Sequence, residues 1–272
     1  MGKTEKILYE ETFEGENSPF TVQVVKPPAA KVTLIDTYRD PERTVAMLTR
    51  GYKGIYDGAE ISDADVQEAF QDVVATRLQD PLASVGGTWL LNNVSRAFTH
   101  QLVRYSQGTR FIQESMRFYG LHGVYKVLAT GKIASSDPHK HDPTLAKVYC
   151  EAAVGSVRSY NELVLMGADS QDARGILPTN ILTNVFFTGN LLNLLNIVTQ
   201  RMCCQAQHPE WLPVIMQVRS IVRETMGDRV ADLLKAPVEL GRPCGYNASF
   251  DRPCTWKNGI KASGEYGSNS EV

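Results

Sequence analysis

The segment from Ser95 to Tyr119, S-R-A-F-T-H-Q-L-V-R-Y-S-Q-G-T-R-F-I-Q-E-S-M-R-F-Y, is dense in side chains that bind anions. Its hydrogen-bonding and charged residues include Arg104, Arg110, Arg117, Gln101, Gln113, Glu114 and Ser115. Arginine holds phosphate or carboxylate through a planar fork of N–H donors. The residues alone leave two interpretations open: an anion-binding site, or a solvated surface with three ordinary arginines.

A second polar group lies in a leucine-rich segment further along the chain. Asn190, Asn193 and Asn196 are spaced three apart, which places them on one side of a helix. Arg201 follows them, and Gln205 lies four residues beyond Arg201. A buried row of asparagines must be hydrogen-bonded. The row is therefore either a helix cap with a polar seam between helices, or a face that binds a flat ligand such as an isoalloxazine or a pyrimidine.

Other chemistries have weaker support. The chain contains no G-x-G-x-x-G, G-K-[ST], C-x-x-C or H-E-x-x-H motif. His139 and His141 lack further His or Cys residues at zinc-like spacing, which favours a solvated loop over a metal site. Cys244 and Cys254 each follow a proline and could each be a nucleophile, but no histidine follows either as a base. Packed or loop cysteines are the favoured interpretation.

Several motifs in the right order carry a resemblance to a family. They are S-R-A at 95–97, H-Q-L-V-R at 100–104, Q-E-S-M-R-F at 113–118, then Arg174, Leu177-Pro178, Thr188-Gly189-Asn190, Asn196, Arg201 and Ala206-Gln207. The first three are similar to the S-R-A-x-x-H-Q-L-V-R-H-R, spacer, [EQ]-x-S-x-R-[YF] signature of the flavin-dependent thymidylate synthases. The resemblance covers about Asp80 to Gln207.

The resemblance implies a fold, an assembly and a reaction. We expect an α+β fold, with a mixed sheet packed against long helices, as a single domain over 1–272 with its core at 30–230 and a loop-rich tail at 240–272. The family forms homotetramers whose active sites combine several subunits. It transfers a one-carbon unit from methylenetetrahydrofolate to C5 of dUMP, with FAD that NADPH has reduced.

The same resemblance assigns roles to individual residues. The residues expected to bind the nucleotide are Gln101, Arg104, Gln113, Glu114, Ser115, Arg117 and Arg174. Arg201 is expected at the pyrimidine edge as the catalytic residue, where it would stabilise the negative charge that develops as the ring is activated. This charge stabilisation replaces a covalent thiolate. The residues expected at the flavin are Arg104, Tyr105, Ser106, Asn190, Asn196 and Gln205.

The chain departs from the family pattern mainly on the flavin and folate side. Tyr105 and Ser106 stand where the family has histidine and arginine, Leu192 replaces an arginine, and Gln205 replaces a histidine. Of an upstream H-x-S-P-x-E-H motif only Pro81 remains. Alternatives therefore stay open: hydroxymethylation of dUMP, methylation or hydroxymethylation of dCMP for modified viral DNA, a non-catalytic nucleotide-binding relative, or a thiolate enzyme.

The elements that must position these residues follow from local patterns. Strands are expected at 7–13, 20–26, 31–38, 124–128 and 180–187, with a short strand at 89–91 after a break at Gly86-Gly87. Helices are expected from Asp40-Pro41 to about 49 with Gly51 ending it, from a capping box at Ser62 to a stop at Pro81, and at 144–166, 190–206 and 211–226. Residues 135–143 and 169–172 are expected to be loops. Helices with a few non-alternating strands favour α+β over a doubly wound fold.

Bulk composition excludes several classes of protein. The 272 residues are 43% hydrophobic and 21% charged, as in soluble globular proteins, and the net charge of −2 provides no global basic field for nucleic acid. No apolar run approaches the roughly 18 residues of a membrane helix, and the first residues lack a signal-peptide core. Five scattered cysteines fit a reducing compartment. We expect a cytoplasmic protein with no membrane or nucleic-acid partner.

Overall fold

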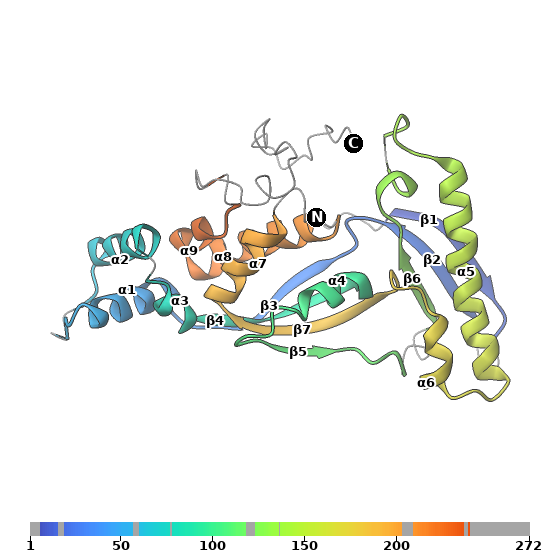
Figure 1. The fold of residues 1–272 in the computed structure, drawn as a ribbon, viewed down its shortest axis with the longest axis horizontal. Coiled ribbons are helices and arrows are strands. Elements are labelled where there is room, and N and C mark those ends of the chain that lie inside the picture. Colours follow the sequence, from blue (N-terminus) through green and yellow to red (C-terminus); the bar gives the residue numbers. More distant parts are fainter. Residues whose placement is uncertain are drawn as a thin grey trace. The chain divides into compact units, whose positions relative to one another are not determined.

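The computed structural model describes residues 6–15, 19–56, 60–76, 78–117, 123–135, 137–202, 209–236 and 239. Its elements, in chain order, are β1 (Lys6–Phe13), β2 (Phe20–Lys26), β3 (Lys31–Thr37), α1 (Pro41–Tyr52), α2 (Asp63–Ala75), α3 (Asp80–Ala83), β4 (Gly86–Ser95), α4 (Arg96–Leu102), β5 (Arg110–Gln113), β6 (Val124–Leu128), η2 (Gly131–Ile133), α5 (Pro143–Leu165), α6 (Ser170–Ala173), η3 (Arg174–Ile176), β7 (Leu182–Asn190), α7 (Leu191–Arg201), α8 (Trp211–Met226) and α9 (Asp228–Leu233) (Figure 1). Helices and strands are mixed, so the α+β class is confirmed.

The chain divides into two compact units. The first comprises residues 1–33, 89–106 and 110–187, and the second comprises residues 34–88, 107–109 and 188–272. The strands form two sheets, one in the order β1-β2-β6 and one in the order β3-β4-β7-β5. The expected single domain over 1–272 stays a prediction, and its tail at 240–272 lies outside the described residues.

The β1-β2-β6 sheet and α5 form the core of the first unit. β1 and β2 are antiparallel, with Phe13 opposite Phe20, whereas β2 and β6 are parallel, with Thr21 opposite Val124. Alternate residues of β2 face α5, which runs along this sheet in Figure 1. The packed cluster comprises Phe20, Val22, Val24, Tyr125, Val127, Cys150, Ala153, Val154, Val157 and Tyr160, among others.

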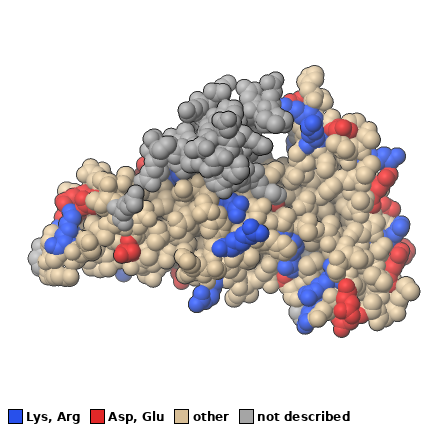
Figure 2. All heavy atoms as spheres, viewed as in Figure 1, with Lys and Arg blue, Asp and Glu red and all other residues tan. Residues whose placement is uncertain are grey.

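The sequence of α5 contains a helix N-cap and a charged, solvent-exposed face. The Asp142 carboxylate accepts hydrogen bonds from the backbone N–H groups of Thr144 and Leu145, and Pro143 occupies the first turn. Figure 2 shows acidic and basic side chains intermixed over the α5 side of this unit. The ion pairs Lys147–Glu151 and Arg158–Glu162, each spaced four residues apart, belong to this exposed face.

Two helices of the second unit, α1 and α2, begin at the predicted caps. Asp40 caps α1, and Ser62 with Asp65 forms the capping box of α2. The Glu42 carboxylate of α1 accepts hydrogen bonds from both the backbone N–H and the guanidinium of Arg229 in α9, each at 2.8 Å.

Gly227 separates α8 from α9 at a φ of 109°, and a Cβ there would lie 2.8 Å from the Glu42 Cγ. Only glycine satisfies both constraints.

Several predicted boundaries were wrong, and each has a local reason. Gly51 does not end α1, which continues to Tyr52 because the Lys53 N–H still bonds to the Thr49 carbonyl. Pro81 does not stop α2, which ends at Ala75; the proline instead lies in the first turn of α3. The segment at 169–172 is not only a loop, because Asp169 caps the short helix α6.

The strands around the predicted site are longer or more numerous than expected. Gly86 and Gly87 are not a break but the first residues of β4, which continues to Ser95 in place of the short strand at 89–91. The polar segment after α4 contains a strand, β5. β7 continues past Phe187 to Asn190. The expected strands at 7–13, 20–26, 31–38 and 124–128 and the helix at 211–226 are confirmed. The expected helix from 190 is described as far as Arg201.

Candidate functional site

In the first unit, the start of α4 is hydrogen-bonded to the residues that immediately precede β7. The Ser95 hydroxyl caps α4 by accepting from the Phe98 N–H at 3.0 Å. The backbone N–H groups of Arg96 and Ala97 donate to the carbonyls of Ile181 and Thr179 at 3.0 and 2.8 Å. The start of the S-R-A motif is therefore fixed in position by main-chain bonds.

The Q-E-S-M-R segment folds back onto α4. The Gln113 amide donates to the Thr99 hydroxyl at 2.8 Å, and the Arg96 guanidinium donates to the Glu114 carbonyl at 2.7 Å. The Ser115 hydroxyl, partly buried, accepts a long hydrogen bond of 3.4 Å from the Arg117 N–H. The structure thus brings Gln113, Glu114 and Ser115 together with the helix that carries Gln101.

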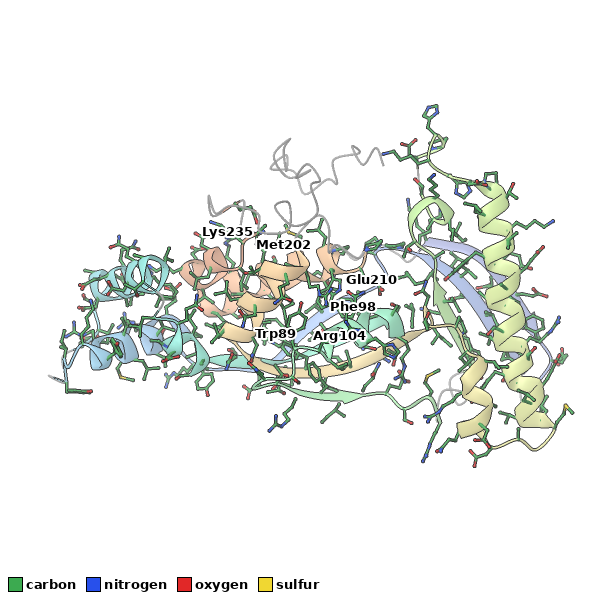
Figure 3. The ribbon with its side chains drawn as sticks, in the orientation of Figure 1. Trp89, Phe98, Arg104, Met202, Glu210 and Lys235 are labelled. Carbon is green, nitrogen blue, oxygen red and sulfur yellow. The ribbon has the colours of Figure 1, made fainter. Side chains whose placement is uncertain are left out.

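The predicted nucleotide-binding arginines of this unit are not neutralised by carboxylates in the described part of the chain. Arg104, just beyond the end of α4, and Arg117 are exposed, whereas Arg174 at the start of η3 is partly buried. Figure 3 labels Arg104 together with Phe98, which is fully buried. Across the described residues, none of these three guanidinium groups forms an ion pair. Within that part of the protein, their positive charge is available to an external anion.

In the second unit, Asn190 and Asn193 cap α7 reciprocally. The Asn190 side-chain oxygen accepts from the Asn193 N–H at 2.9 Å, and the Asn193 side-chain oxygen accepts from the Asn190 N–H at 3.0 Å. The Asn193 amide also donates to the Gln107 carbonyl at 2.7 Å. Helix capping, one of the two interpretations of the asparagine row, is confirmed for these two residues. Asn196 is exposed to solvent.

A cavity of about 470 Å³ lies beside the start of α7, entirely within the second unit. It is lined by Asp36, Thr37, Tyr38, Ala83, Ser84, Val85, Gly86, Gly87, Thr88, Gly108, Thr188, Gly189 and Asn190. Among these lining residues, Asp36 is the only one with a formal charge at neutral pH, and the rest offer hydroxyl, amide and backbone groups. The volume falls in the range of small-molecule sites.

Glycine is required where the strands around this cavity approach each other. A Cβ on Gly86 would clash with the Gly189 carbonyl oxygen and lie 2.6 Å from the Asn190 Cα. A Cβ on Gly87 would lie 2.9 Å from the Asp36 carbonyl oxygen. The Thr88 and Thr188 hydroxyls are hydrogen-bonded to each other at 3.1 Å. These glycines bring β4 against its neighbours and shape the cavity wall.

Arg201, the predicted catalytic residue, is the last residue of α7. Its Cζ lies 5.2 Å from the centroid of the Trp211 ring at the start of α8. Trp211 is 1% exposed and the neighbouring Glu210 is 4% exposed, whereas Arg201 is partly buried. Figure 3 labels Glu210 and also Met202, which is buried. The guanidinium therefore forms a cation–π contact with a buried aromatic ring.

The remaining predicted residues differ in exposure, and several lie outside the described part of the chain. Tyr105 is partly buried and Ser106 is exposed. Gln205, Ala206, Gln207, Cys244 and Cys254 lie outside the described residues. His139 and His141 belong to no metal-binding cluster among the residues that the structure describes. Burial raises the pKa of the Cys150 thiol, which disfavours the nucleophilic thiolate there.

Sequence reasoning missed three residues that contact predicted site residues. Thr99 receives the Gln113 amide, Asn184 contacts Glu114, and Trp211 lies against Arg201. The only sequence signal for Asn184 was a polar residue within an apolar strand. Trp211 had none beyond its position at a helix start.

The chain is similar to known proteins over most of its length. The family model described as "Thymidylate synthase complementing protein" matches residues 33–226. A flavin-dependent thymidylate synthase from Geobacter sulfurreducens is 26% identical over 234 residues, covering 82% of this chain and 97% of the relative. A second flavin-dependent thymidylate synthase, from Sulfurisphaera tokodaii, is 28% identical over 181 residues, covering 65% of this chain and 67% of the relative.

A solved structure shows the same fold. The UMP/dUMP methylase PolB from Streptomyces cacaoi, bound with 5-Br dUMP, matches with a TM-score of 0.63 and 16% identity, covering 76% of this chain and 95% of that one. In the described part of the chain, no helix is both long and apolar enough to span a membrane. The family match extends across both anchored motifs, α4 with the Q-E-S-M-R segment and α7 with its asparagine cap, and the chain therefore belongs to the thymidylate synthase complementing protein family.

Proposed function

We propose that this protein transfers a one-carbon unit from methylenetetrahydrofolate to C5 of a deoxypyrimidine monophosphate, with conversion of dUMP to dTMP as its main reaction. The proposal includes FAD as cofactor and NADPH as its reductant. It also includes a homotetrameric enzyme in the cytoplasm. Family membership and the names of the relatives support the reaction class.

The observation that carries the proposal is the attachment of the Q-E-S-M-R segment to α4. Two hydrogen bonds, Gln113 to Thr99 and Arg96 to Glu114, hold the segment. The unit also presents Arg104, Arg117 and Arg174 without internal ion pairs among the described residues. Guanidinium forks with a serine hydroxyl suit a phosphate monoester. In this proposal they bind the nucleotide phosphate, and Gln101 and Gln113 bind the nucleoside.

In this proposal, the cavity beside Asn190 binds a neutral part of the flavin cofactor. Its lining offers hydroxyl, amide and backbone groups, with a carboxylate at Asp36 and no Lys or Arg among the described lining residues. Such a lining suits a heteroaromatic ring or a polyol better than a pyrophosphate, which a carboxylate repels. Asn190, which lines this cavity, would hold the cofactor. Asn196, Arg104, Tyr105, Ser106 and Gln205 are proposed cofactor contacts on the family resemblance alone. When bound, FAD supplies the hydride that completes the methyl group.

Arg201 is proposed to act on the substrate by electrostatics. Its guanidinium is held against the buried Trp211 ring, so its position is restricted before substrate binds. A preorganised cation at the pyrimidine edge stabilises negative charge that develops as C5 becomes nucleophilic. No cysteine is needed for this step. Loss of turnover on removing both Cys244 and Cys254 would favour the thiolate alternative instead.

The direct test measures the nucleotide product. Purified protein is incubated with FAD, NADPH and methylenetetrahydrofolate, together with dUMP, dCMP or UMP in separate reactions, and the nucleotide mass is measured. UMP is included because the structural relative is a UMP/dUMP methylase. A gain of one methyl on dUMP is expected, and a gain of hydroxymethyl or a product from dCMP would replace the main reaction with a variant. A protein that neither binds FAD nor changes any nucleotide contradicts the proposal.

A further inference from the structure

Asn184, the third residue of β7, forms hydrogen bonds through its side-chain amide and its main chain to two other segments of the first unit. Its side-chain oxygen accepts from the Asn92 amide and from the Asn93 N–H, each at 3.2 Å. Its side-chain NH2 and its backbone N–H both donate to one Glu114 carboxylate oxygen, at 3.0 and 3.2 Å. Its carbonyl accepts from the Glu114 N–H at 3.0 Å. The side chain is thus committed on both ends.

Glu114 is fixed on every side as a result. Its N–H and carboxylate bond to Asn184, and its carbonyl accepts from the Arg96 guanidinium at 2.7 Å. Glu114 is partly buried, as are its neighbours Gln113 and Ser115. A residue held through its main chain and its side chain restricts the backbone of the residues on either side. The direction of Gln113 and Ser115 therefore depends on the contact between Glu114 and Asn184.

The hydrogen bonds from Asn184 also hold the negative charge of Glu114 in a defined direction. A carboxylate beside a phosphate site would repel the ligand. Two donors from Asn184 draw one carboxylate oxygen towards β7. Asn93, the partner of the other end of the Asn184 amide, is the one non-glycine residue with positive φ in the described ranges, at 55°. Asparagine tolerates that conformation better than most residues.

We propose that Asn184 and Glu114 form a positioning pair that orients Gln113, Ser115 and Arg117 for an anionic nucleotide. The inference rests on the proposed function, since it concerns how that site holds the phosphate monoester. It gives Glu114 a positioning role in place of the predicted direct contact with substrate. Asn184, outside every motif of the family signature, is the second member of the pair.

Asn184→Asp tests the pair selectively. The variant keeps the oxygen that accepts from Asn92 and Asn93 but replaces the NH2 with an oxygen that faces the Glu114 carboxylate. Two facing carboxylates repel each other, so the 113–117 segment should turn away. The dissociation constant for dUMP, measured by calorimetry, should rise about tenfold or more. The kcat at saturating dUMP should change much less than KM, as expected when binding in ground and transition states is lost equally.

A compensating change separates positioning from a general structural defect. In the double variant Asn184→Asp with Glu114→Gln, one carboxylate faces an amide again, and dUMP affinity should return to within about threefold of wild type. Asn161→Asp is the matched control, because the Asn161 oxygen accepts from the Tyr125 hydroxyl and its NH2 donates to the Val157 carbonyl in α5. It removes one donated hydrogen bond in the same unit and should leave dUMP affinity unchanged.

The outcomes decide the inference in each case. Unchanged affinity in Asn184→Asp, failure of the double variant to recover, or equal loss in Asn161→Asp overturns it. If Asn184→Asp does not fold, the double variant alone must fold and bind dUMP, or the inference fails.

A separate measurement distinguishes failure of the inference from failure of the proposed function. Wild-type protein that binds no pyrimidine nucleotide contradicts the proposed function. Hydrogen exchange of the 110–117 peptide in the ligand-free protein then tests the pair. Faster exchange in Asn184→Asp, reversed in the double variant, supports the positioning pair, and identical exchange in all three proteins overturns it.

Discussion

The guanidinium carbon of Arg201 lies 5.2 Å from the centroid of the Trp211 ring. The ring is 1% exposed, so it cannot move away easily and restricts the plane of the guanidinium. A cation–π contact contributes about 0.5–2 kcal/mol, with the larger values for contacts removed from water. The pairing joins the end of α7 to the start of α8, two helices that the sequence predicts separately.

Trp211→Leu should lower kcat by roughly two- to thirtyfold, which is the same free energy expressed as a rate. Trp211→Phe keeps an aromatic face and should lose less. Steady-state kinetics with saturating dUMP measures both, and thermal melts report the cost of the lost volume. Equal loss of kcat in the two variants would contradict a role for the aromatic face.

Arg201→Ala should reduce kcat about 10²- to 10³-fold, the usual effect of removing one preorganised donor at developing charge. Binding of dUMP should weaken less, because the charge appears only as the ring reacts. Arg223→Ala is the control: Arg223 is an exposed arginine of α8 that pairs with Asp228 and Asp232. Comparable loss in the control, or unchanged turnover in Arg201→Ala, is inconsistent with the proposed role.

Asn190 has two proposed roles that substitutions can separate. Asn190→Asp keeps an oxygen for the Asn193 N–H and should preserve stability, but it removes the amide donor and should weaken FAD binding. Asn190→Ala should also lose the cap, at a cost of about 0.5–2 kcal/mol. Denaturant titrations and flavin fluorescence give the two quantities. FAD affinity that is unaffected in both variants would remove Asn190 from the cofactor site.

Gly86→Ala should destabilise the protein by about 1–3 kcal/mol, because the new methyl group would collide with the Gly189 carbonyl. Gly155→Ala is the opposite case. Gly155 lies inside α5, and a methyl group added there would meet nothing within 4 Å, so alanine should stabilise the helix by about 0.5–1 kcal/mol. Chemical denaturation measures both changes, and a stable Gly86→Ala variant would mean that the strands separate without cost.

Stability at high pH should depend on Tyr125. Burial raises the pKa of Tyr125 to about 12, and its hydroxyl donates to Asn161 at 3.0 Å. The unfolded chain ionises this group first, near its ordinary value of 10.0. Its contribution is therefore fully present below about pH 10 and is lost as pH rises towards 12.

The control for that pH dependence is Tyr125→Phe. Other tyrosines also ionise in this range, so the informative quantity is the difference in unfolding free energy between wild type and Tyr125→Phe from about pH 8 to 12. The difference should shift against wild type above about pH 10. A constant difference would show that Tyr125 ionises alike in the folded and unfolded protein.

Helix starts with strong capping signals, and the family, could be predicted from the residues alone. Asp40-Pro41, Ser62 with Asp65 and Asp142-Pro143 begin helices because each N-terminus needs an acceptor for its free N–H groups, and those acceptors are adjacent in sequence. The S-R-A, H-Q-L-V-R and Q-E-S-M-R motifs identified the family, which the matched family model confirms.

The contacts between site residues, in contrast, depend on how elements distant in sequence pack together. Asn184 meets Glu114 seventy residues away, and Gln113 meets Thr99, because β7, β5 and α4 pack together. Periodicity reports which face of an element is buried but not its partner. For the same reason β5 and the extension of β4 through Gly86 were missed: their backbone groups are satisfied by neighbouring strands that are distant in sequence. The requirement for glycine at Gly86 and Gly87 likewise comes from the strands packed against them. The Arg201–Trp211 contact comes from the packing of α7 against α8.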